Sequence, residues 1–520
     1  MTASATSCAM QGLHGAPVTV EVDVANGLPS FTIVGLTDRA IQEARDRVRS
    51  AVRNAGFDFP QRRITVNLAP AELPKEGSGF DLAISLALLS AAERPLDLAG
   101  VAFVAELGLD GNVRPVAGVL PMARCLRDAG FRRLTVAQDN ALEASFVEGL
   151  EVIAATTLRG CFDHFAGKPC LVTAERSQPR PPAATVESDL EDVHGQAVAK
   201  RALEIAAAGG HNLLMVGPPG SGKTMLAKSF CSILPDLTVE EALEVSAVYS
   251  IRGAFDERPP TARRPPFRAP HHSVSRAGLI GGGFRRVVPG EITMAHKGTL
   301  FLDEIPEFPR GHLEALRQPL EDHRVTISRA HGAVLFPAEF IFVAAANPCP
   351  CGHLGDPRRV CSCDPRHVGS YQSRLSGPLR DRIDLRINVP RQPYAALFEV
   401  TANREPSRVV RRRVEVARHR QLERLPATAA GWGAVAAMTP LNSRLGGKRL
   451  LRSCRLTAQA SRLLETAGEK LQLSARGFFR VLRVARTIAD LEGEEGVGDA
   501  AVAEALSYRS EMTGAGRSAA

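Results

Sequence analysis

Long apolar runs, aromatic side chains and an excess of one charge are all scarce in this sequence of 520 residues. The longest apolar run, at residues 82–92, is too short to cross a bilayer, and residues 1–10 lack the basic and apolar segments of a signal peptide. The formal charge of +8 permits a polyanionic partner without requiring one. We therefore expect a cytoplasmic chain with no membrane partner, organised as about three domains.

Cysteine occurs ten times, but in a reducing cytoplasm these residues are not expected to form disulfides. Six are scattered and should pack as ordinary side chains. The other four follow the pattern C-x-C, nine residues, C-x-C: Cys349, Cys351, Cys361 and Cys363. Four neighbouring thiols suit a tetrahedral zinc site, with His353 and His367 as spare ligands. Because C-x-C is tighter than the usual zinc spacing, a redox switch and plain packing cysteines remain alternatives.

The chain divides by pattern into three parts and one linker. Residues 1–170 mix strand and helix periodicities and predict an α/β domain. A Pro-rich linker follows at residues 171–188, because its prolines cannot hold a helix or a central strand. Strand and helix patterns then alternate over residues 189–393, and an Arg-rich region over residues 394–510 is helical by pattern.

Four elements of the first domain can be placed by periodicity. Apolar residues alternate at 18–24 and recur at 64–68, which predicts two strands. Residues 38–55 carry apolar side chains at helical spacing, and residues 81–92 are apolar throughout, so two helices are expected.

A nucleotide site is indicated by a short apolar segment, residues 212–216, that runs into a Gly-rich loop and a helix. This is the context that a P-loop requires. Its glycines let backbone N–H groups surround phosphates, Lys223 should reach the β- and γ-phosphates, and Thr224 should hold Mg²⁺. The sequence therefore predicts ATP and Mg²⁺ binding by Gly217, Pro218, Pro219, Gly220, Ser221, Gly222, Lys223 and Thr224.

Two later strands end in polar residues that complete such a site. The strand at residues 299–302 ends in Asp303 and Glu304, a Walker B pattern in which the first binds Mg²⁺ and the second acts as general base. The strand at residues 340–346 ends in Asn347, which can orient the attacking water as a sensor 1 residue. A turn-forming Asn before a proline is the alternative for this last residue.

These three motifs, in this order, resemble those of AAA+ ATPases. Further stretches are similar to the magnesium-chelatase-like branch, and most closely to the ComM/YifB family: residues 195–196, 208–212, 269–273, 289–291 and 375–384. The resemblance runs from about residue 6 to residue 510. It implies a parallel α/β AAA+ core followed by a helical lid.

The resemblance also implies an assembly and a function. Members form rings, usually hexamers, with ATP sites shared between neighbours. By motif, Arg382 matches the arginine finger that acts on the next subunit's ATP, and Arg476 matches the sensor 2 arginine. This chain departs from the family at Arg380, where an apolar residue is more common, and the extra arginine is a second candidate finger. The implied activity is ATP-driven branch migration and unwinding during the integration of incoming single-stranded DNA in natural transformation. The implied partners are single-stranded and branched DNA.

The first domain resembles Lon-type proteases at residues 74–79 and 107–118. A Ser–Lys protease needs a serine nucleophile and a lysine base. By position, the nucleophile falls on Gly79 and the lysine on Leu120, while Ser78 lies one position early. We therefore expect an inactive Lon-like fold, with a live ATP-dependent protease as an alternative.

Basic residues mark where nucleic acid would contact the chain. An insertion between the P-loop and the Walker B strand, and residues 321–329, resemble hairpins that face the ring's pore in this branch. Arginines contact phosphate without reading sequence, and the scarcity of aromatics argues against base stacking. For these arginines, the alternative is a solvated basic loop. For the chain as a whole, the alternative function is a protein-remodelling ATPase. The arginines of the first insertion are Arg263, Arg264, Arg268, Arg276, Arg285 and Arg286.

Overall fold

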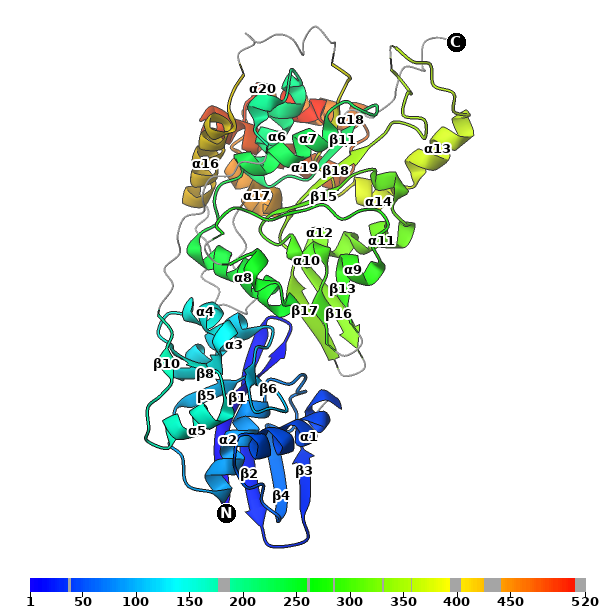
Figure 1. Cartoon of the computed structure of the whole chain (residues 1–520). Coiled ribbons are helices and arrows are strands. Elements are labelled where there is room, and N and C mark those ends of the chain that lie inside the picture. The colour runs from blue at the N-terminus through cyan, green and yellow to red at the C-terminus, as the bar shows by residue number, and fades with distance from the viewer. Residues whose placement is uncertain are drawn as a thin grey trace.

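The computed structural model describes residues 1–35, 39–175, 188–259, 262–283, 286–329, 332–356, 358–392, 404–424 and 441–509. Most of the predicted linker, part of the junction before the last region, and Arg285 lie outside these residues. The chain forms an elongated particle with the N-terminal domain at one end and the helical C-terminal region at the other (Figure 1). None of the helices in the described ranges is long and apolar enough to cross a membrane.

The N-terminal domain is built on a mixed eight-stranded sheet. Its order is β10-β9-β8-β5-β1-β2-β4-β3, parallel on the β9–β8–β5–β1 side and antiparallel through β1, β2 and β4. The strands are β1 (Thr2–Gln11), β2 (His14–Ala25), β3 (Ser30–Val34), β4 (Arg63–Ala69), β5 (Val101–Val104), β8 (Arg133–Ala137), β9 (Glu151–Ala155) and β10 (Val172–Thr173), with a separate ribbon of β6 (Glu106–Leu107) and β7 (Val113–Arg114).

The helices of this domain confirm the periodicity argument. The predicted strand at 18–24 lies within β2 and the one at 64–68 within β4, while the predicted helices match α1 and α2. Helix α2 is apolar on every side, and all but two of its twelve residues are buried. The helices are α1 (Arg39–Asn54), α2 (Asp81–Ala92), α3 (Val119–Asp128), α4 (Gln138–Ser145) and α5 (Leu158–Phe165).

The second sheet is parallel throughout, with the order β12-β15-β18-β11-β19. Its central strands are buried apolar runs, as expected for a sheet covered on both faces. The strands are β11 (Leu213–Val216), β12 (Phe267–Arg268), β15 (Thr299–Leu302), β18 (Ile341–Ala346) and β19 (Leu385–Asn388). The helices around it are α6 (Ala197–Gly209), α7 (Lys223–Phe230), α8 (Val239–Arg252), α10 (Glu291–Met294), α11 (Arg310–Ala315), α12 (Arg317–Asp322), α13 (Pro365–Ser373) and α14 (Gly377–Arg380).

Two insertions leave this sheet on the side of the N-terminal domain (Figure 1). The first contains helix α9 (Arg276–Ile280) and a short ribbon of β13 (Gly281–Gly282) and β14 (Val288–Pro289). The second is the antiparallel hairpin of β16 (Arg324–Arg329) and β17 (Gly332–Pro337).

The C-terminal region is helical, as predicted, and packs on the core through one continuous apolar cluster. Arginines of its basic helix α16 form an interface with α6 within the chain. Arg413 Nε lies 2.5 Å from Glu204, and Arg418 donates to the carbonyl of Ala207, both on α6. The helices are α16 (Ser407–Arg424), α17 (Gly447–Cys454), α18 (Ala458–Lys470), α19 (Ala475–Glu492) and α20 (Asp499–Ser507).

Candidate active site

The P-loop connects β11 to α7, and its lysine is the first helical residue. Lys223 is buried, and its Nζ donates to the carbonyls of Gly217 at 2.7 Å and Pro218 at 3.0 Å. The same amine lies 3.3 Å from Oδ1 of Asn347, so two residues predicted from separate motifs meet. Burial lowers the pKa of Lys223, while the charges of Asp303 and Glu304 oppose this change.

The predicted magnesium ligands also meet. Thr224 Oγ1 donates to Oδ2 of Asp303 at 2.7 Å, although 79 residues separate them. A hydroxyl in the first turn of α7 and a carboxylate at the carboxyl end of β15 form the hard oxygen pair that Mg²⁺ prefers beside phosphates. These two residues therefore fit the metal that the P-loop pattern implies.

Glu304 is held in an unusual backbone conformation. Its φ of +48° places a non-glycine residue in the left-handed region, where it precedes a short 3₁₀ turn (Ile305–Glu307). Its side chain is 54% exposed, as a carboxylate that must reach a water needs to be. Nδ1 of His272 lies 4.0 Å from this carboxylate. The negative charge of Glu304 also acts on Tyr371: burial, together with the charges of Glu307 and Glu304, raises the pKa of Tyr371 to about 12.

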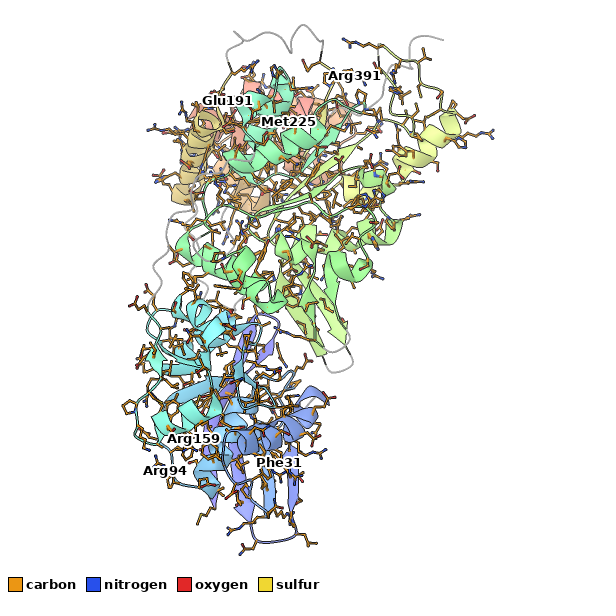
Figure 2. The ribbon with its side chains drawn as sticks, in the orientation of Figure 1. Phe31, Arg94, Arg159, Glu191, Met225 and Arg391 are labelled. Carbon is orange, nitrogen blue, oxygen red and sulfur yellow. The ribbon has the colours of Figure 1, made fainter. Side chains whose placement is uncertain are left out.

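Two residues to which the sequence analysis gave no role contact the P-loop from outside. Gln196 donates through Nε2 to the carbonyls of Ser221 and Pro390, at 3.2 and 2.7 Å. Arg391 donates to the carbonyl of Pro219 at 3.1 Å and lies in the same upper part of the molecule as Met225 of α7 (Figure 2). The pair Gly195–Gln196 was singled out only by family resemblance, and nothing in the sequence marked Arg391.

The four cysteines of the cluster converge. All four sulfurs lie within 4.8 Å of one another, and the Sγ–Sγ distances from Cys349 to Cys351 and to Cys361 are 3.4 and 3.6 Å. A tetrahedral zinc ion with Zn–S bonds of about 2.3 Å would separate its sulfurs by about 3.8 Å. The four residues therefore fit a Cys₄ zinc site.

The cysteine loop contacts the P-loop directly. Gly352 has φ +80°, and a Cβ at this position would lie 2.5 Å from Cδ of Pro219. The loop begins two residues after Asn347, and Gln372 Nε2 of α13 donates to the carbonyl of the intervening Pro348 at 3.0 Å. One face of the nucleotide site therefore rests on the cysteine cluster.

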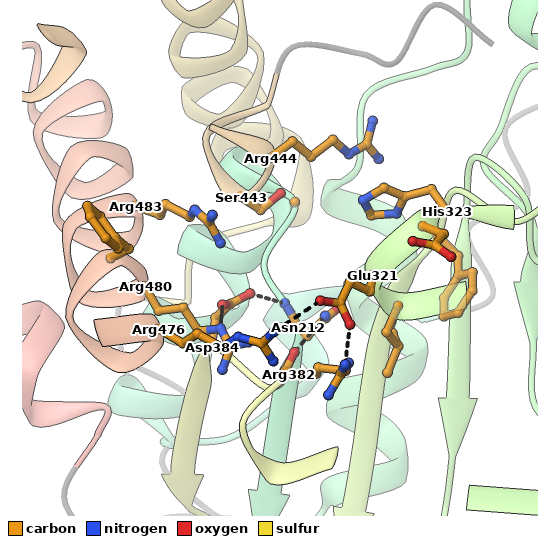
Figure 3. Close-up of a pocket in the computed structure, with 15 residues that line it drawn as sticks. Asn212, Glu321, His323, Arg382, Asp384, Ser443, Arg444, Arg476, Arg480 and Arg483 are labelled. Atoms are coloured by element: carbon orange, nitrogen blue, oxygen red, sulfur yellow. Dashed lines mark hydrogen bonds and ion pairs between the residues drawn. The ribbon is translucent and has the colours of Figure 1, made fainter. Parts of the chain in front are cut away.

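Arg382 and Arg476, the predicted arginine finger and sensor 2 residue, lie together in a pocket of about 370 Å³ (Figure 3). Both contact the carboxylate of Glu321, the former by a hydrogen bond and the latter at 3.5 Å. These guanidinium groups hold the pKa of Glu321 below its usual range. Arg480 and Asp384 line the same pocket, 3.5 Å apart. Arg380 is exposed outside it.

The P-loop and this pocket lie at opposite ends of the parallel strands. Gly217, Asp303 and Asn347 follow the carboxyl ends of β11, β15 and β18. Asn212 precedes β11, and its Nδ2 donates to the carbonyl of Arg382 at 2.9 Å. At ~3.3 Å per residue, about 16 Å of strand separates Asn212 from Gly217. Arg382 therefore faces away from the P-loop of its own chain.

Several arginines of the first insertion have partners within the chain. Arg263 donates to the carbonyl of Leu237 at 2.8 Å, and Arg268 pairs with Glu291 at 2.6 Å. Arg286 reaches the N-terminal domain. These partners and their partial burial make the three poor candidates for DNA contact, whereas Arg276 is exposed on α9.

The Lon-like segments show no Ser–Lys pair. Gly79 lines a cavity described below, and Leu120 is buried in a core cluster. The Ser78 hydroxyl hydrogen-bonds the Glu106 carboxylate, and Lys75 Nζ donates to a backbone carbonyl. Ser78 thus contacts a carboxylate, and neither contact brings a lysine amine to a serine hydroxyl as a Ser–Lys dyad requires.

Three family models match the chain. The model for Magnesium chelatase, subunit ChlI, covers residues 189–397. The model for Subunit ChlI of Mg-chelatase covers residues 20–140, and that for the ChlI C-terminal region covers residues 404–509.

Full-length relatives agree with these models. Competence protein ComM of Haemophilus influenzae is 44% identical over 511 residues, covering 97% of this chain and 96% of its own length. Protein YifB of Salmonella typhimurium is 43% identical over 501 residues, with 96% and 95% covered. Lon protease 2 of Bacillus subtilis is 25% identical over 126 residues, 24% of this chain and 22% of its own, and this likeness lies in the N-terminal region. The chain therefore belongs to the magnesium-chelatase-like AAA+ ATPases, within the ComM/YifB family.

Proposed function

We propose that this protein is an ATP-driven DNA motor that assembles as a hexameric ring of identical chains. It would act as a helicase or branch-migration translocase and promote integration of single-stranded DNA by homologous recombination in natural transformation. The identity to a competence protein supports the biological role. The ring is supported by the positions of the site residues: the P-loop and Arg382 lie at opposite ends of the sheet, so a neighbouring copy would be needed to bring an arginine finger to the ATP.

The residues divide the chemistry between two subunits. In one chain, Lys223 and the P-loop amides bind the β- and γ-phosphates, Asn347 orients the attacking water, and Glu304 accepts its proton. Thr224 and Asp303 would hold Mg²⁺, which would supply positive charge beside the phosphates. The neighbouring chain brings Arg382 and Arg476, and their positive charge stabilises the transferring phosphoryl group. These last two side chains already lie in one pocket.

DNA would be gripped by its backbone. Arg276 on α9 and Arg324 at the start of the β16–β17 hairpin are the arginines best placed for this, because each lies on an insertion and is at least partly exposed. Contacts of this kind carry no base information and weaken with salt.

A protein-remodelling ATPase is the second candidate. The family models are those of the magnesium chelatase ChlI subunit, which favours this candidate for the ATPase core. The additional Lon-like region, inactive in our proposal, favours the DNA motor.

The proposal predicts strand displacement from a synthetic three- or four-way DNA junction with ATP. The wild type should displace a strand, whereas Glu304→Gln should bind ATP and lose displacement, because the amide cannot accept the proton of water. Glu307→Gln, a matched change three residues on, should retain displacement. If the wild type hydrolyses ATP and leaves the junction intact, DNA is the wrong substrate or a loader is missing, and the protein-remodelling candidate moves to first place.

We further propose that the cysteine cluster holds a structural Zn²⁺. We expect about one zinc ion per chain in freshly purified protein. The double change Cys361→Ser and Cys363→Ser should remove most of it, while Cys170→Ser, an exposed cysteine outside the cluster, should not. Elemental analysis of the purified protein measures the zinc content, and protein free of zinc would favour the redox switch or plain packing cysteines.

We also propose the domain division: an inactive Lon-like domain at 1–170, a linker at 171–188, an ATPase core at 189–393 and a lid at 394–510. Strand β10, at the start of that linker, pairs with β9 of the N-terminal sheet. Two family models, ending at residue 397 and beginning at residue 404, support the last boundary.

A further inference from the structure

The former catalytic segments of the Lon-like region line a cavity of about 440 Å³ whose other wall belongs to the ATPase domain. Residues 76–80 and 115–117 form one side. The facing side chains come from α8, the first insertion and the second hairpin: Ile251, Arg286, Val287, Ala333 and Val334. In Figure 1 the N-terminal domain accordingly lies directly beneath α8 and the β16–β17 hairpin.

A backbone contact ties the two domains at the tip of the β1–β2 hairpin. Gly12 has φ +64°, and a Cβ there would lie 2.6 Å from the carbonyl oxygen of Leu335 in β17. The same Cβ would lie 3.1 Å from Cγ1 of Val334. Only glycine permits this conformation together with this approach.

An apolar cluster surrounds that contact. Ile251, Val287 and Phe336 are buried together, and Met10 and Leu13 from the β1–β2 hairpin pack against them. Four segments that are distant in the sequence therefore share one small core. Separating the N-terminal domain from the second hairpin would expose this core to water.

Polar groups fasten the remaining edges. Arg286 donates to the carbonyl of Ala117 at 3.3 Å, and the Ser250 hydroxyl hydrogen-bonds the Glu143 carboxylate. That carboxylate also accepts from the backbone N–H of Leu120 at 2.9 Å. The position that would hold the protease lysine is thus part of the network that joins the domains.

We infer that the former protease site is a socket that fastens the N-terminal domain to the two insertions. The domain then travels with the β16–β17 hairpin, and the loss of protease residues fits a surface whose partner is this chain's own insertions. The inference rests on the proposed function only in requiring that the hairpin moves with ATP hydrolysis.

The test compares Gly12→Val with Gly130→Val in the full chain. Both glycines have positive φ, but a Cβ at Gly130 meets nothing within 4 Å. Gly12→Val should speed hydrogen exchange at residues 10–14 and 332–337 by about tenfold or more, because the side chain forces the two backbones apart. It should also lower junction strand displacement by about tenfold, with ATP turnover kept within about twofold. Gly130→Val should change neither.

Leu13→Asp provides a second route, because it places a charge in the same apolar cluster without positive-φ strain. Unchanged exchange in both variants would overturn the socket. Wild-type displacement despite faster exchange would overturn the coupling. A wild type that displaces no DNA would count against the proposed function, and the exchange result would still decide for or against the socket.

Discussion

Lys223→Ala is expected to lower ATP turnover by about 10²–10³-fold, the usual cost of removing a donor that stabilises transition-state charge. The amine is buried and held at the loop by two carbonyls and by Asn347, so its removal takes a fixed positive charge out of the phosphate site. Steady-state phosphate release, measured with nucleotide binding by fluorescence titration, provides the result.

Lys228→Ala is the matched control, because Lys228 is an exposed lysine in the last turn of the same helix. It should retain full turnover. If the Lys223 variant hydrolyses ATP at the wild-type rate with its fold intact by circular dichroism, the nucleotide site has been assigned to the wrong loop.

Arg382→Ala should lower turnover by about 10³-fold or more, as loss of an arginine finger does. Nucleotide affinity should change little, because Arg382 lies at the far end of β11 from the P-loop of its own chain. Arg380→Ala, an exposed arginine two residues earlier, should retain most activity and so decides between the two candidate fingers.

Mixing the two variants tests more directly whether the ATP site is shared between subunits. Chains with Lys223→Ala and chains with Arg382→Ala should each show little turnover, but random mixing would place an intact arginine beside an intact P-loop at about a quarter of the interfaces. Recovered turnover in the mixture shows that the site is shared. A mixture as inactive as its parts would place the catalytic arginine elsewhere.

The strand-tip residues could be predicted because each depends on local sequence. A buried strand followed by a Gly-rich loop or by acids fixes where the side chains lie, and the contacts of Lys223 with Asn347 and of Thr224 with Asp303 follow from parallel pairing. The fold class was confirmed for the same reason, because helix and strand periods are distinct along most of the chain.

Long-range partners could not be predicted. The arginines of the first insertion were predicted to contact DNA or to lie on a solvated loop, because the burial of an arginine depends on acceptors that lie far away in the sequence. Arg413 finds Glu204 on α6, and Arg286 finds a carbonyl of the other domain. The same holds for the pocket that brings Glu321 to Arg382 and Arg476.

The two half-sites at opposite ends of the sheet have one more consequence. An interface that joins unlike surfaces repeats head to tail, so it closes into a ring only when the rotation between neighbours divides a full turn. Arg476 lies on α19 of the C-terminal helical region, while Arg382 follows α14 of the core, and in the proposed ring both would contact the same neighbour. In the proposed ring, the angle between the helical region and the core would therefore set the subunit number, and a small change in that angle would convert a closed ring into an open spiral.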